Sequence, residues 1–447
     1  MDKEIDSPKT SKSLKKDLTK STIEQTQIED KINEIFKQYS FNIKDSENFK
    51  DTDDETEIKY LSHLHYEFAK NHMKAIPQGY ESLDSGMPWF SYWVINILNM
   101  CEKGGYILSH NMKMKFVKYL SELRHEDGGF CGYPKGKPHI ISNYAAVMAI
   151  IALGEVEGYE LIDVEKMEKF LLSLKNNNLQ KEDQINTKFD KKGNFLIDFS
   201  DKSNINSYQS SFPGSFQVHE CGESDLRACY CAISVCSILD IDNPDIYKGV
   251  SENIAQCQTF EGGLGPEPFC EAHGGYSFCG IATLCLMGKL NVIDTDRFVH
   301  WLTNRQMSSE GGFQGRTNKL VDSCYSFWQG SVFNMLLNND KSKFSINSEM
   351  LYDQCALQAY ILLACQNHKG GLFDKPGKNP DLFHTNYASS GLILSQESLI
   401  KDLNISISYH ESLEFEQMDP IFCVSKDLVN KARSYFLNKK DKLLSNK

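Results

Sequence analysis

Three residues of types that commonly bind zinc occupy related places in two sequence repeats. Asp322 and Cys324 open one small-residue and aromatic helical run, and His384 stands at the start of the next one. Each alone has a structural explanation, because Asp is a common helix N-cap and a buried thiol behaves as a small hydrophobe. Together they offer oxygen, sulfur and nitrogen ligands, and three protein ligands with one open position are typical of catalytic zinc sites. Thiolate and imidazole favour zinc over Mg²⁺.

A second group of candidate residues is cationic. His273, Arg316 and Lys319 lie in turns that come just before helical runs. Either turn alone could be merely solvated, but around a metal these side chains would form a cradle for a polyanion, most simply a diphosphate. Helix N-termini would add positive potential there. A local basic cluster is informative because the whole chain is acidic, with a formal net charge of −12.

Aromatic residues form a third group, which recurs in the helical runs. Its members are Trp89, Tyr92, Trp93, Tyr144, Tyr230, Tyr276, Tyr325, Trp328 and Tyr387. Aromatics at helical spacing usually belong to a core. The central space of a ring of helices is not always filled, however, so an aromatic-lined funnel could hold a long apolar ligand.

Glycine turns divide the chain into the repeats that must position these groups. Copies stand at residues 128–132, 262–265, 311–315 and 370–372, with a degenerate one at 213–216. Gly263 and Gly312 are 49 residues apart, and self-similarity at a fixed period indicates a repeat architecture. The helical runs that follow the turns, with one earlier run, begin near Pro88, Asn143, Arg227, Tyr276, Cys324 and Asn386.

Amphipathic helices are predicted between these runs, for example over residues 163–175, with Asp163, Asp294 and Ser425 as N-caps. Helices that are apolar all round belong inside a protein and amphipathic ones outside. We therefore predict an all-α fold, a six-hairpin α/α toroid with its glycine turns gathered at one end. An open solenoid is the alternative, but it would need polar caps at both ends.

Composition sets the predicted domain limits. Residues 1–58 are polar, and such a segment buries too little apolar surface to offset its ordering entropy, so we expect it to be disordered. Residues 59–440 should form one barrel domain, with a polar surface insertion at about 176–211 and a tail at 441–447.

The same composition bounds the class of protein. The 14 cysteines lie largely inside apolar runs, which indicates reduced thiols and a cytoplasmic location. The acidic charge speaks against nucleic-acid binding. We also expect no secretory signal and no membrane span, because the longest apolar stretches are far shorter than a bilayer requires.

Three long motifs resemble those of the protein prenyltransferase β subunits: residues 271–280, 311–330 and 370–390. The resemblance covers about Leu83 to Phe436. It implies an α/α barrel, an obligate heterodimer with a helical-repeat α subunit, and one catalytic Zn²⁺ per β subunit. It also implies transfer of an isoprenoid from its diphosphate to the cysteine of CaaX-ending proteins such as small GTPases.

Site roles carried over by this resemblance fall into four sets. The zinc ligands would be Asp322, Cys324 and His384. The diphosphate-binding group would be His273, Arg316, Lys319 and Tyr325. The isoprenoid wall would be Tyr230, Arg227, Tyr276, Cys279 and Trp328. His139, Glu223 and Arg227 would lie near the C-terminal carboxylate of the substrate, whose last residue would meet Trp89 and Trp93.

Within the family, Trp89, Tyr387 and Asp374 favour the farnesyl-transferring members. The first two match a bulky pair that shortens the isoprenoid cavity, and geranylgeranyl enzymes have a smaller residue at the tryptophan position. Asp374 matches a carboxylate that supports Mg²⁺ at the diphosphate. The chain departs from the pattern at Phe383, where the family has tyrosine, and at residues 141–142, which bears on CaaX preference.

Three alternatives remain at the level of sequence. A type I geranylgeranyltransferase β subunit would share the fold. A terpene cyclase would share the toroid and its glycine and aromatic repeats, but it would need an Asp-rich motif and would leave the Asp, Cys and His set unexplained. A non-enzymatic repeat scaffold would make the metal and cationic groups accidental.

Overall fold

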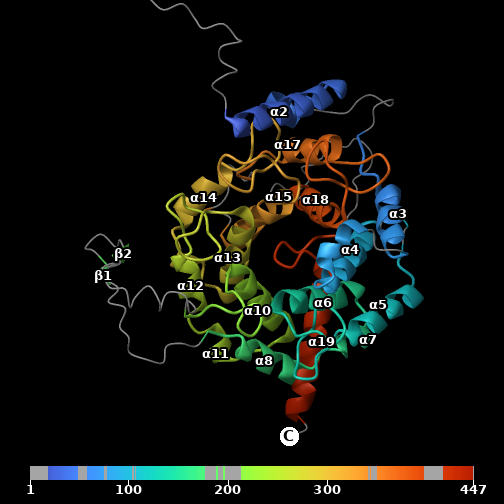
Figure 1. The fold of residues 1–447 in the computed structure, drawn as a ribbon, viewed down its shortest axis with the longest axis vertical. Helices are drawn as coiled ribbons and strands as arrows, with labels where there is room; N and C mark the ends of the chain where they lie inside the picture. Colours follow the sequence, from blue (N-terminus) through green and yellow to red (C-terminus); the bar gives the residue numbers. More distant parts are fainter. Residues whose placement is uncertain are drawn as a thin grey trace, which may run out of the picture.

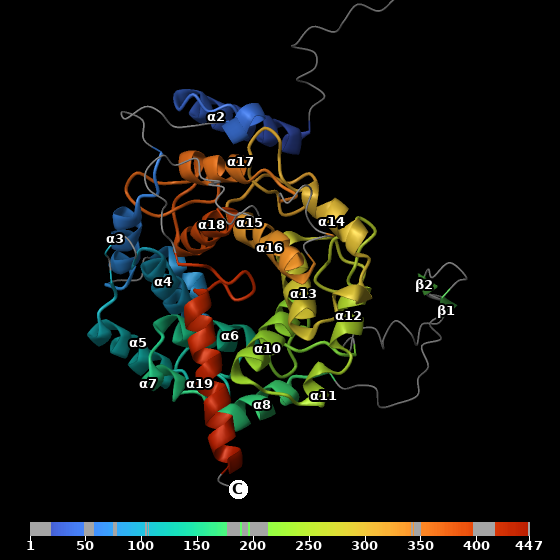
Figure 2. The same cartoon turned by 180° about the vertical axis from the view of Figure 1, so that it is seen from behind.

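The computed structural model describes residues 19–48, 58–74, 78–102, 105, 107–176, 188–189, 195–196, 213–340, 343, 350–396 and 416–445. Its helices form two concentric layers around a common centre (Figures 1 and 2). Among the helices of these ranges, none is both long and apolar enough to cross a membrane.

The inner layer consists of the apolar helical runs. Its helices are α4 (Met87–Met100), α6 (Ile140–Leu153), α10 (Leu226–Leu239), α13 (Gly274–Met287), α15 (Tyr325–Trp328) with α16 (Gly330–Asn339), and α18 (Leu382–Ser395). Most of their residues are buried; in α6 only Ile141 of the fourteen residues is not. Each begins within four residues of its predicted start, so the all-α toroid is confirmed.

The outer layer consists of shorter amphipathic helices. They are α3 (Ser62–His72), α5 (His110–Glu122), α8 (Val164–Ser173), α12 (Val250–Gln256), α14 (Thr295–Thr303) and α17 (Gln354–Ala359), the last continuing into a π-helical turn over Tyr360–Ala364. Along the chain, short turns of helix connect inner helices to outer ones at α7 (Val156–Tyr159), α11 (Pro244–Tyr247) and η4 (Leu290–Val292), and η2 (Gln78–Leu83) precedes α4. Two predicted caps are confirmed: Asp163 accepts from the Lys166 amide at 3.1 Å and Asp294 from the Arg297 amide at 3.0 Å.

The glycine turns attach each repeat to the next outer helix. A Cβ on Gly262 would collide with the Arg297 carbonyl of α14, and one on Gly311 would collide with Ala356 of α17. The last turn continues the pattern across the chain's ends, because a Cβ on Gly370 would collide with the Leu64 carbonyl of α3. The C-terminal repeat therefore docks on the first outer helix, which closes the ring and excludes an open solenoid.

The last helix differs from the prediction. Helix α19 (Lys426–Ser445) packs against α10 and α6 and crosses one face of the ring (Figure 2). Ser425 directly precedes it, but the Ser425 hydroxyl makes no hydrogen bond, so the predicted cap is wrong. The helix also includes residues 441–445, which composition had assigned to a tail. Residues 416–425, here called the floor loop, enter the ring just before α19 (Figure 1).

The N-terminal segment also differs from expectation. Residues 20–38 of the polar segment 1–58 form helix α2, and Ile43–Asn48 form η1. Composition alone hid a narrow apolar stripe at Ile28, Ile32 and Phe36, which are buried and recur every four residues. The stripe packs beside the π-helical turn at 360–364. Residues 1–18 lie outside the described ranges, as does most of the 176–211 insertion, where β1 (Lys188–Phe189) pairs antiparallel with β2 (Phe195–Leu196).

A buried carboxyl group lies under α2 and should make stability depend on pH. The Glu310 side chain is fully buried, accepts one hydrogen bond from Gln25 at 2.6 Å, and leaves its other oxygen without a partner. Burial raises the pKa of Glu310 to about 7 from an ordinary 4.5. The folded protein therefore holds a proton that the unfolded chain releases, and stability falls as pH rises between these values.

We expect Glu310→Gln to raise the Tm at pH 8 and to change it little at pH 4.5, because the amide removes the cost of ionising a buried group. Thermal unfolding at both values measures this. Glu34→Gln, on the exposed face of α2, is the control. A Tm difference that does not depend on pH would contradict the assignment.

Candidate active site

The predicted zinc ligands converge at the glycine-turn end of the ring. Asp322 and Cys324 stand in the turn that leads into α15, and His384 lies in the first turn of α18. One ligand atom from each lies within 4.8 Å of the others, and His384 Nε2 is 3.3 Å from Asp322 Oδ1. Cys324 is buried and the other two are partly buried. This compact set of oxygen, sulfur and nitrogen donors fits Zn²⁺ better than a harder cation.

Local hydrogen bonds fix these side chains. The Cys324 amide donates to Asp322 Oδ1 at 2.9 Å, which folds the two ligands of that turn together. Asp381 caps α18: it accepts from the His384 amide at 2.7 Å and contacts His384 Nδ1 at 2.6 Å. The histidine thus presents Nε2 to Asp322, as in metal sites where a carboxylate orients the imidazole. Asp381 was missed from the sequence, although its place three residues before His384 was a usable signal.

The electrostatics of the group suit a bound cation. Burial, and next the Asp322 carboxylate, raise the pKa of the Cys324 thiol well above its ordinary value. Burial lowers the pKa of His384, but Asp322 and Asp381 outweigh it and raise the value to about 10. Without a metal, protons therefore occupy this group. A divalent cation would supply the positive charge that those protons provide.

A cationic pocket of about 290 Å³ adjoins the metal group. It is lined by Asp322, Tyr325, Arg316, Lys319 and Lys375, among others, and by Ser21 and Glu24 from the first turns of α2. Tyr325 Oη lies 3.0 Å from His273 Nε2, and Arg316 pairs with Glu271 at 3.4 Å. Burial, and next the Arg316 charge, lower the pKa of His273 to about 4, so this imidazole is neutral at pH 7.

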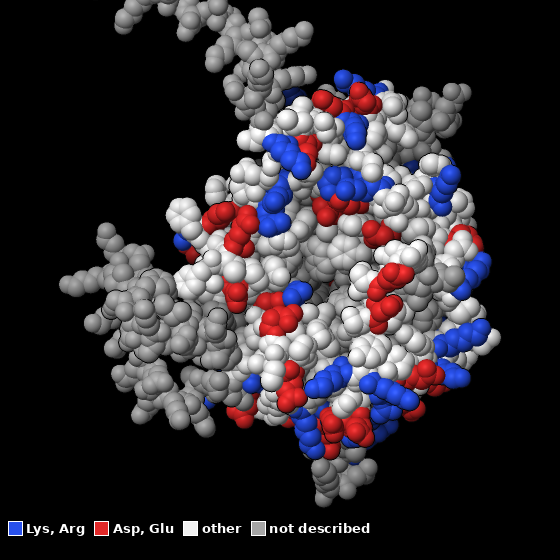
Figure 3. Space-filling view, in the orientation of Figure 1, with Lys and Arg blue, Asp and Glu red and all other residues white. Residues whose placement is uncertain are grey.

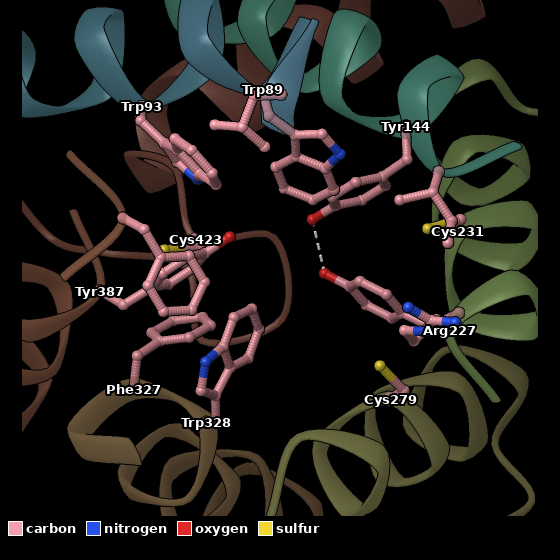
Figure 4. A pocket seen from close by; sticks show the side chains of 14 residues that line it. Trp89, Trp93, Tyr144, Arg227, Cys231, Cys279, Phe327, Trp328, Tyr387 and Cys423 are labelled. Carbon is pink, nitrogen blue, oxygen red and sulfur yellow. Dashed lines mark hydrogen bonds between the residues drawn. The ribbon is translucent and has the colours of Figure 1, made fainter. Parts of the chain in front are cut away.

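An apolar cavity of about 290 Å³ lies inside the ring (Figure 4). Its walls are Leu83, Trp89, Trp93, Ile141, Tyr144, Arg227, Tyr230, Cys231, Cys279, Phe327, Trp328, Phe383, Tyr387 and Cys423. The Tyr144 and Tyr230 hydroxyls meet at 2.6 Å, and the rings of Trp328 and Tyr387 are in contact, tilted by 39°, with centroids 4.2 Å apart. Figure 3, drawn from the same side as Figure 1, shows that the surface is hollowed at the centre of the ring, with charged side chains around the hollow.

The metal group stands where the two spaces meet. Asp322 lines the cationic pocket, while Phe383, next to His384 in the chain, lines the apolar cavity. Helix α15 also borders both spaces, because its Tyr325 lines the cationic pocket and its Trp328 lines the apolar cavity. A ligand with a charged head and a long apolar tail could therefore place the junction between them beside the metal group.

This arrangement has a known counterpart. Residues 61–424 match the model of the prenyltransferase alpha-alpha toroid domain. The chain belongs to the prenyltransferase α/α toroid family. The match spans both helical layers and every residue of the metal group, so the family and the site concern the same domain.

Individual members of the prenyltransferase family are similar over most of the chain. The protein farnesyltransferase subunit beta of Pisum sativum is 32% identical over 411 residues, covering 78% of this chain and 88% of that protein. The Schizosaccharomyces pombe protein of the same name is 30% identical over 383 residues, with 84% and 90% covered. The geranylgeranyl transferase type-1 subunit beta of Arabidopsis thaliana is 37% identical over 202 residues, but these cover only 42% and 51%.

A solved structure supports the fold. The Candida albicans protein geranylgeranyltransferase-I complexed with GGPP matches with a TM-score of 0.64 and 21% identity, covering 85% of this chain and 99% of that one. At this identity the likeness concerns the arrangement of helices.

Most of the aromatic residues predicted for the isoprenoid and peptide sites lie around the apolar cavity. Trp89, Trp93 and Tyr387 line the cavity as expected, whereas Tyr276 is absent from its walls. The Tyr276 ring instead lies 5.8 Å from the Arg227 guanidinium, at the cavity's edge. Cys231, Phe327 and Cys423 were missed as wall residues, because their sequence context is that of ordinary core.

The polar group at the side of the cavity is built around Arg227. Its guanidinium pairs with Asp225, Nη2 lying 2.5 Å from Oδ2, and stands 3.9 Å from Glu223. His139 caps α6 by accepting a hydrogen bond from the Ile141 amide at 3.2 Å. It is close enough to Glu223 and Arg227 for both charges to affect its pKa. The structure thus brings the three predicted residues together. It adds Asp225, which was not predicted and which fixes the arginine.

Asp374 lies close to the metal group. Its carboxylate pairs with Lys375, and its carbonyl accepts from the Ser323 amide at 2.9 Å. Burial, and next the charge of Asp322, raise the pKa of Asp374. A second cation beside the cationic pocket would relieve this repulsion between the two carboxylates.

Proposed function

We propose that this chain is the catalytic β subunit of a protein farnesyltransferase. It would transfer farnesyl from farnesyl diphosphate to the cysteine thiol of C-terminal CaaX motifs, in a heterodimer with an α subunit. The observation that carries this proposal is the place of Asp322, Cys324 and His384 between a cationic pocket and an aromatic cavity. The relatives named farnesyltransferase subunit beta support the choice of donor.

The residues divide the chemistry between them. Zinc held by the metal group would lower the pKa of a thiol at its open position, so that a substrate cysteine is presented as a thiolate. A new sulfur–carbon bond then forms at C1 of the isoprenoid while the bond from C1 to the diphosphate oxygen breaks. The thiol proton leaves to solvent, and the diphosphate carries away the bonding electron pair.

Stabilisation of that leaving group falls to the cationic pocket. Arg316 and Lys319 carry permanent charge where the diphosphate develops its own. Burial raises the pKa of Tyr325, so its phenol keeps the proton and can donate it in a hydrogen bond. His273 is neutral at pH 7 and holds this phenol in place. No side chain needs to act as a nucleophile.

The donor length follows from the cavity walls. Trp89 packs against Trp93 and Tyr144, with ring centroids 5.7 and 5.9 Å away. Tyr387 packs against Trp328 on the opposite side. These bulky walls suit a C15 chain better than a C20 chain. The second candidate is a type I geranylgeranyltransferase β subunit, favoured by the partial similarity to the Arabidopsis protein of that name.

The deciding experiment is prenyl transfer to a CaaX peptide by the chain purified with its partner subunit. C15 and C20 diphosphates are compared in the presence of Zn²⁺ and Mg²⁺. A strong C15 preference is expected. A C20 preference would keep the chemistry but replace the donor, and no transfer with either donor would overturn the proposal.

Asp374 gives a separate prediction about Mg²⁺. We expect Asp374→Asn to raise the Mg²⁺ concentration needed for half-maximal rate by about tenfold, the scale of losing one supporting carboxylate. A titration of rate against Mg²⁺ at saturating donor measures it. Asp296→Asn, on outer helix α14, is the control and should leave the curve in place. An unchanged curve for Asp374→Asn would refute its role.

A further inference from the structure

The floor loop closes the apolar cavity from below. It is a tight turn, in which Met418 and Ser425 pair as an antiparallel bridge and the Asp419 carboxylate accepts from the amides of Ile421 and Phe422 at 2.8 and 3.1 Å. Cys423 is the one residue of the loop among the cavity's walls. Figure 4 shows it beside Tyr387 and Trp93, and its thiol is close enough to affect the pKa of Tyr387.

Two inner helices hold this loop by its backbone, and a third contacts its Cys423 side chain. Tyr92 of α4 donates to the Cys423 carbonyl at 2.8 Å, and Asn96 of α4 donates to the same oxygen at 2.9 Å. Tyr230 of α10 donates to the Ile421 carbonyl at 2.6 Å. The Cys423 thiol lies 3.2 Å from the Ser390 hydroxyl of α18. Buried carbonyls with these partners give the loop one fixed position.

The loop lies at the deep end of the cavity. Its contacts on α18, Asn386 and Ser390, are two and six residues beyond His384 of the metal group, which corresponds to about 3 and 9 Å along a helix. Trp89, in contrast, stands in the first turn of α4, nearer the entrance, and Tyr387 stands in the second turn of α18, between these two contacts. An apolar tail anchored at the cationic pocket would therefore meet Trp89 and Tyr387 as side walls and Cys423 as its end wall.

We propose that the floor loop is a specificity-determining element of the isoprenoid site, with Cys423 as the end stop and Tyr92 as the residue that positions it. This rests on the proposed function, since it assigns the depth of the same cavity. Donor length would then be measured in two directions, laterally by Trp89 and Tyr387 and in depth by Cys423. The loop acts only on the tail of the donor and not on the chemistry at C1.

Two substitutions at one position test the end stop. Cys423 has φ +53°, a backbone conformation that glycine adopts freely, so Cys423→Gly deepens the cavity without straining the turn. Cys423→Met fills it with two additional heavy atoms. With C10, C15 and C20 diphosphates, glycine should raise the C20-to-C15 ratio of kcat/KM by about tenfold, and methionine should raise the C10-to-C15 ratio similarly.

The positioning role is tested from outside the cavity. Tyr92→Phe removes the hydrogen bond to the Cys423 carbonyl but changes no wall residue. It should raise the C20-to-C15 ratio of kcat/KM, as Cys423→Gly does, but by a smaller factor, with the KM for peptide unchanged. Tyr159→Phe is the matched control, because the buried Tyr159 hydroxyl has no hydrogen-bond partner, and its profile should equal that of the wild type.

Donor binding by the heterodimer, measured without peptide, separates the two hypotheses. Absence of binding of any isoprenoid diphosphate to the wild type would overturn the proposed function and this inference with it. Wild-type binding and transfer with an unshifted donor profile in both Cys423 variants would overturn the inference alone. Opposite shifts in the two variants, in the predicted directions, would support it.

Discussion

Replacing Cys324 by Ala is expected to abolish prenyl transfer and zinc retention together. Cys324 supplies the only sulfur of the metal group, and the Asp and His that remain lose the soft ligand that favours zinc. The loss should exceed the roughly 10- to 100-fold cost of removing an orienting partner. Zinc per heterodimer by atomic absorption and single-turnover transfer measure the two effects on the same preparation.

Controls separate this effect from general damage to the fold. Cys236→Ala removes another buried thiol, on the far turns of α10, and should keep both zinc and activity. Asp381→Asn keeps all three ligands but removes the carboxylate at 2.6 Å from His384, so it should weaken zinc retention by about 10- to 100-fold without abolishing it. A Cys324→Ala protein with full zinc and a normal rate would refute the metal assignment.

Replacing Trp89 by Thr is expected to convert donor preference from C15 towards C20. The indole packs against three neighbouring rings, those of Tyr92, Trp93 and Tyr144, and forms one side of the cavity. Its removal opens space for a further isoprene unit. The C20-to-C15 ratio of kcat/KM should rise by about 10- to 100-fold, the discrimination that steric pockets usually provide.

Trp89→Phe is the matched variant because it keeps an aromatic wall of smaller size. It should retain the C15 preference with a modest shift. A Trp89→Thr protein that loses C15 activity without gaining C20 activity, while still binding zinc, would show that the indole supports the fold or the peptide and does not measure the donor.

The sequence predicted the parts of the fold that repeat. Inner helices were found because their residues are small and apolar on every side, and the metal group because Asp322, Cys324 and His384 occupy related points of adjacent repeats. Helix α2 was missed because its apolar stripe is diluted in a polar composition. Its burial depends on a surface at residues 360–364, far away in the sequence.

Parts of the site that depend on long-range contacts could not be predicted. The floor loop has no helical or strand periodicity, and its place is set by side chains of α4 and α10 that bind its carbonyls from more than 190 residues away. The pattern likewise gave no reason to place Cys423 apart from other core cysteines. Asp381 and Asp225 were overlooked for a different reason, since helix caps are so common that a further role is not visible.

The closure of the ring has a consequence for how the chain is made. His65 in α3 accepts a hydrogen bond from the Gly371 amide at 2.9 Å, across 306 residues of sequence. At typical synthesis rates α3 leaves the ribosome about 15 to 60 s before its partner. During that interval the surfaces of α3 and α4 that pack against the last repeat remain uncovered on the nascent chain. The first repeats therefore need protection until the last one is synthesised. Truncation anywhere before the final glycine turn would leave this apolar surface exposed and prone to aggregation.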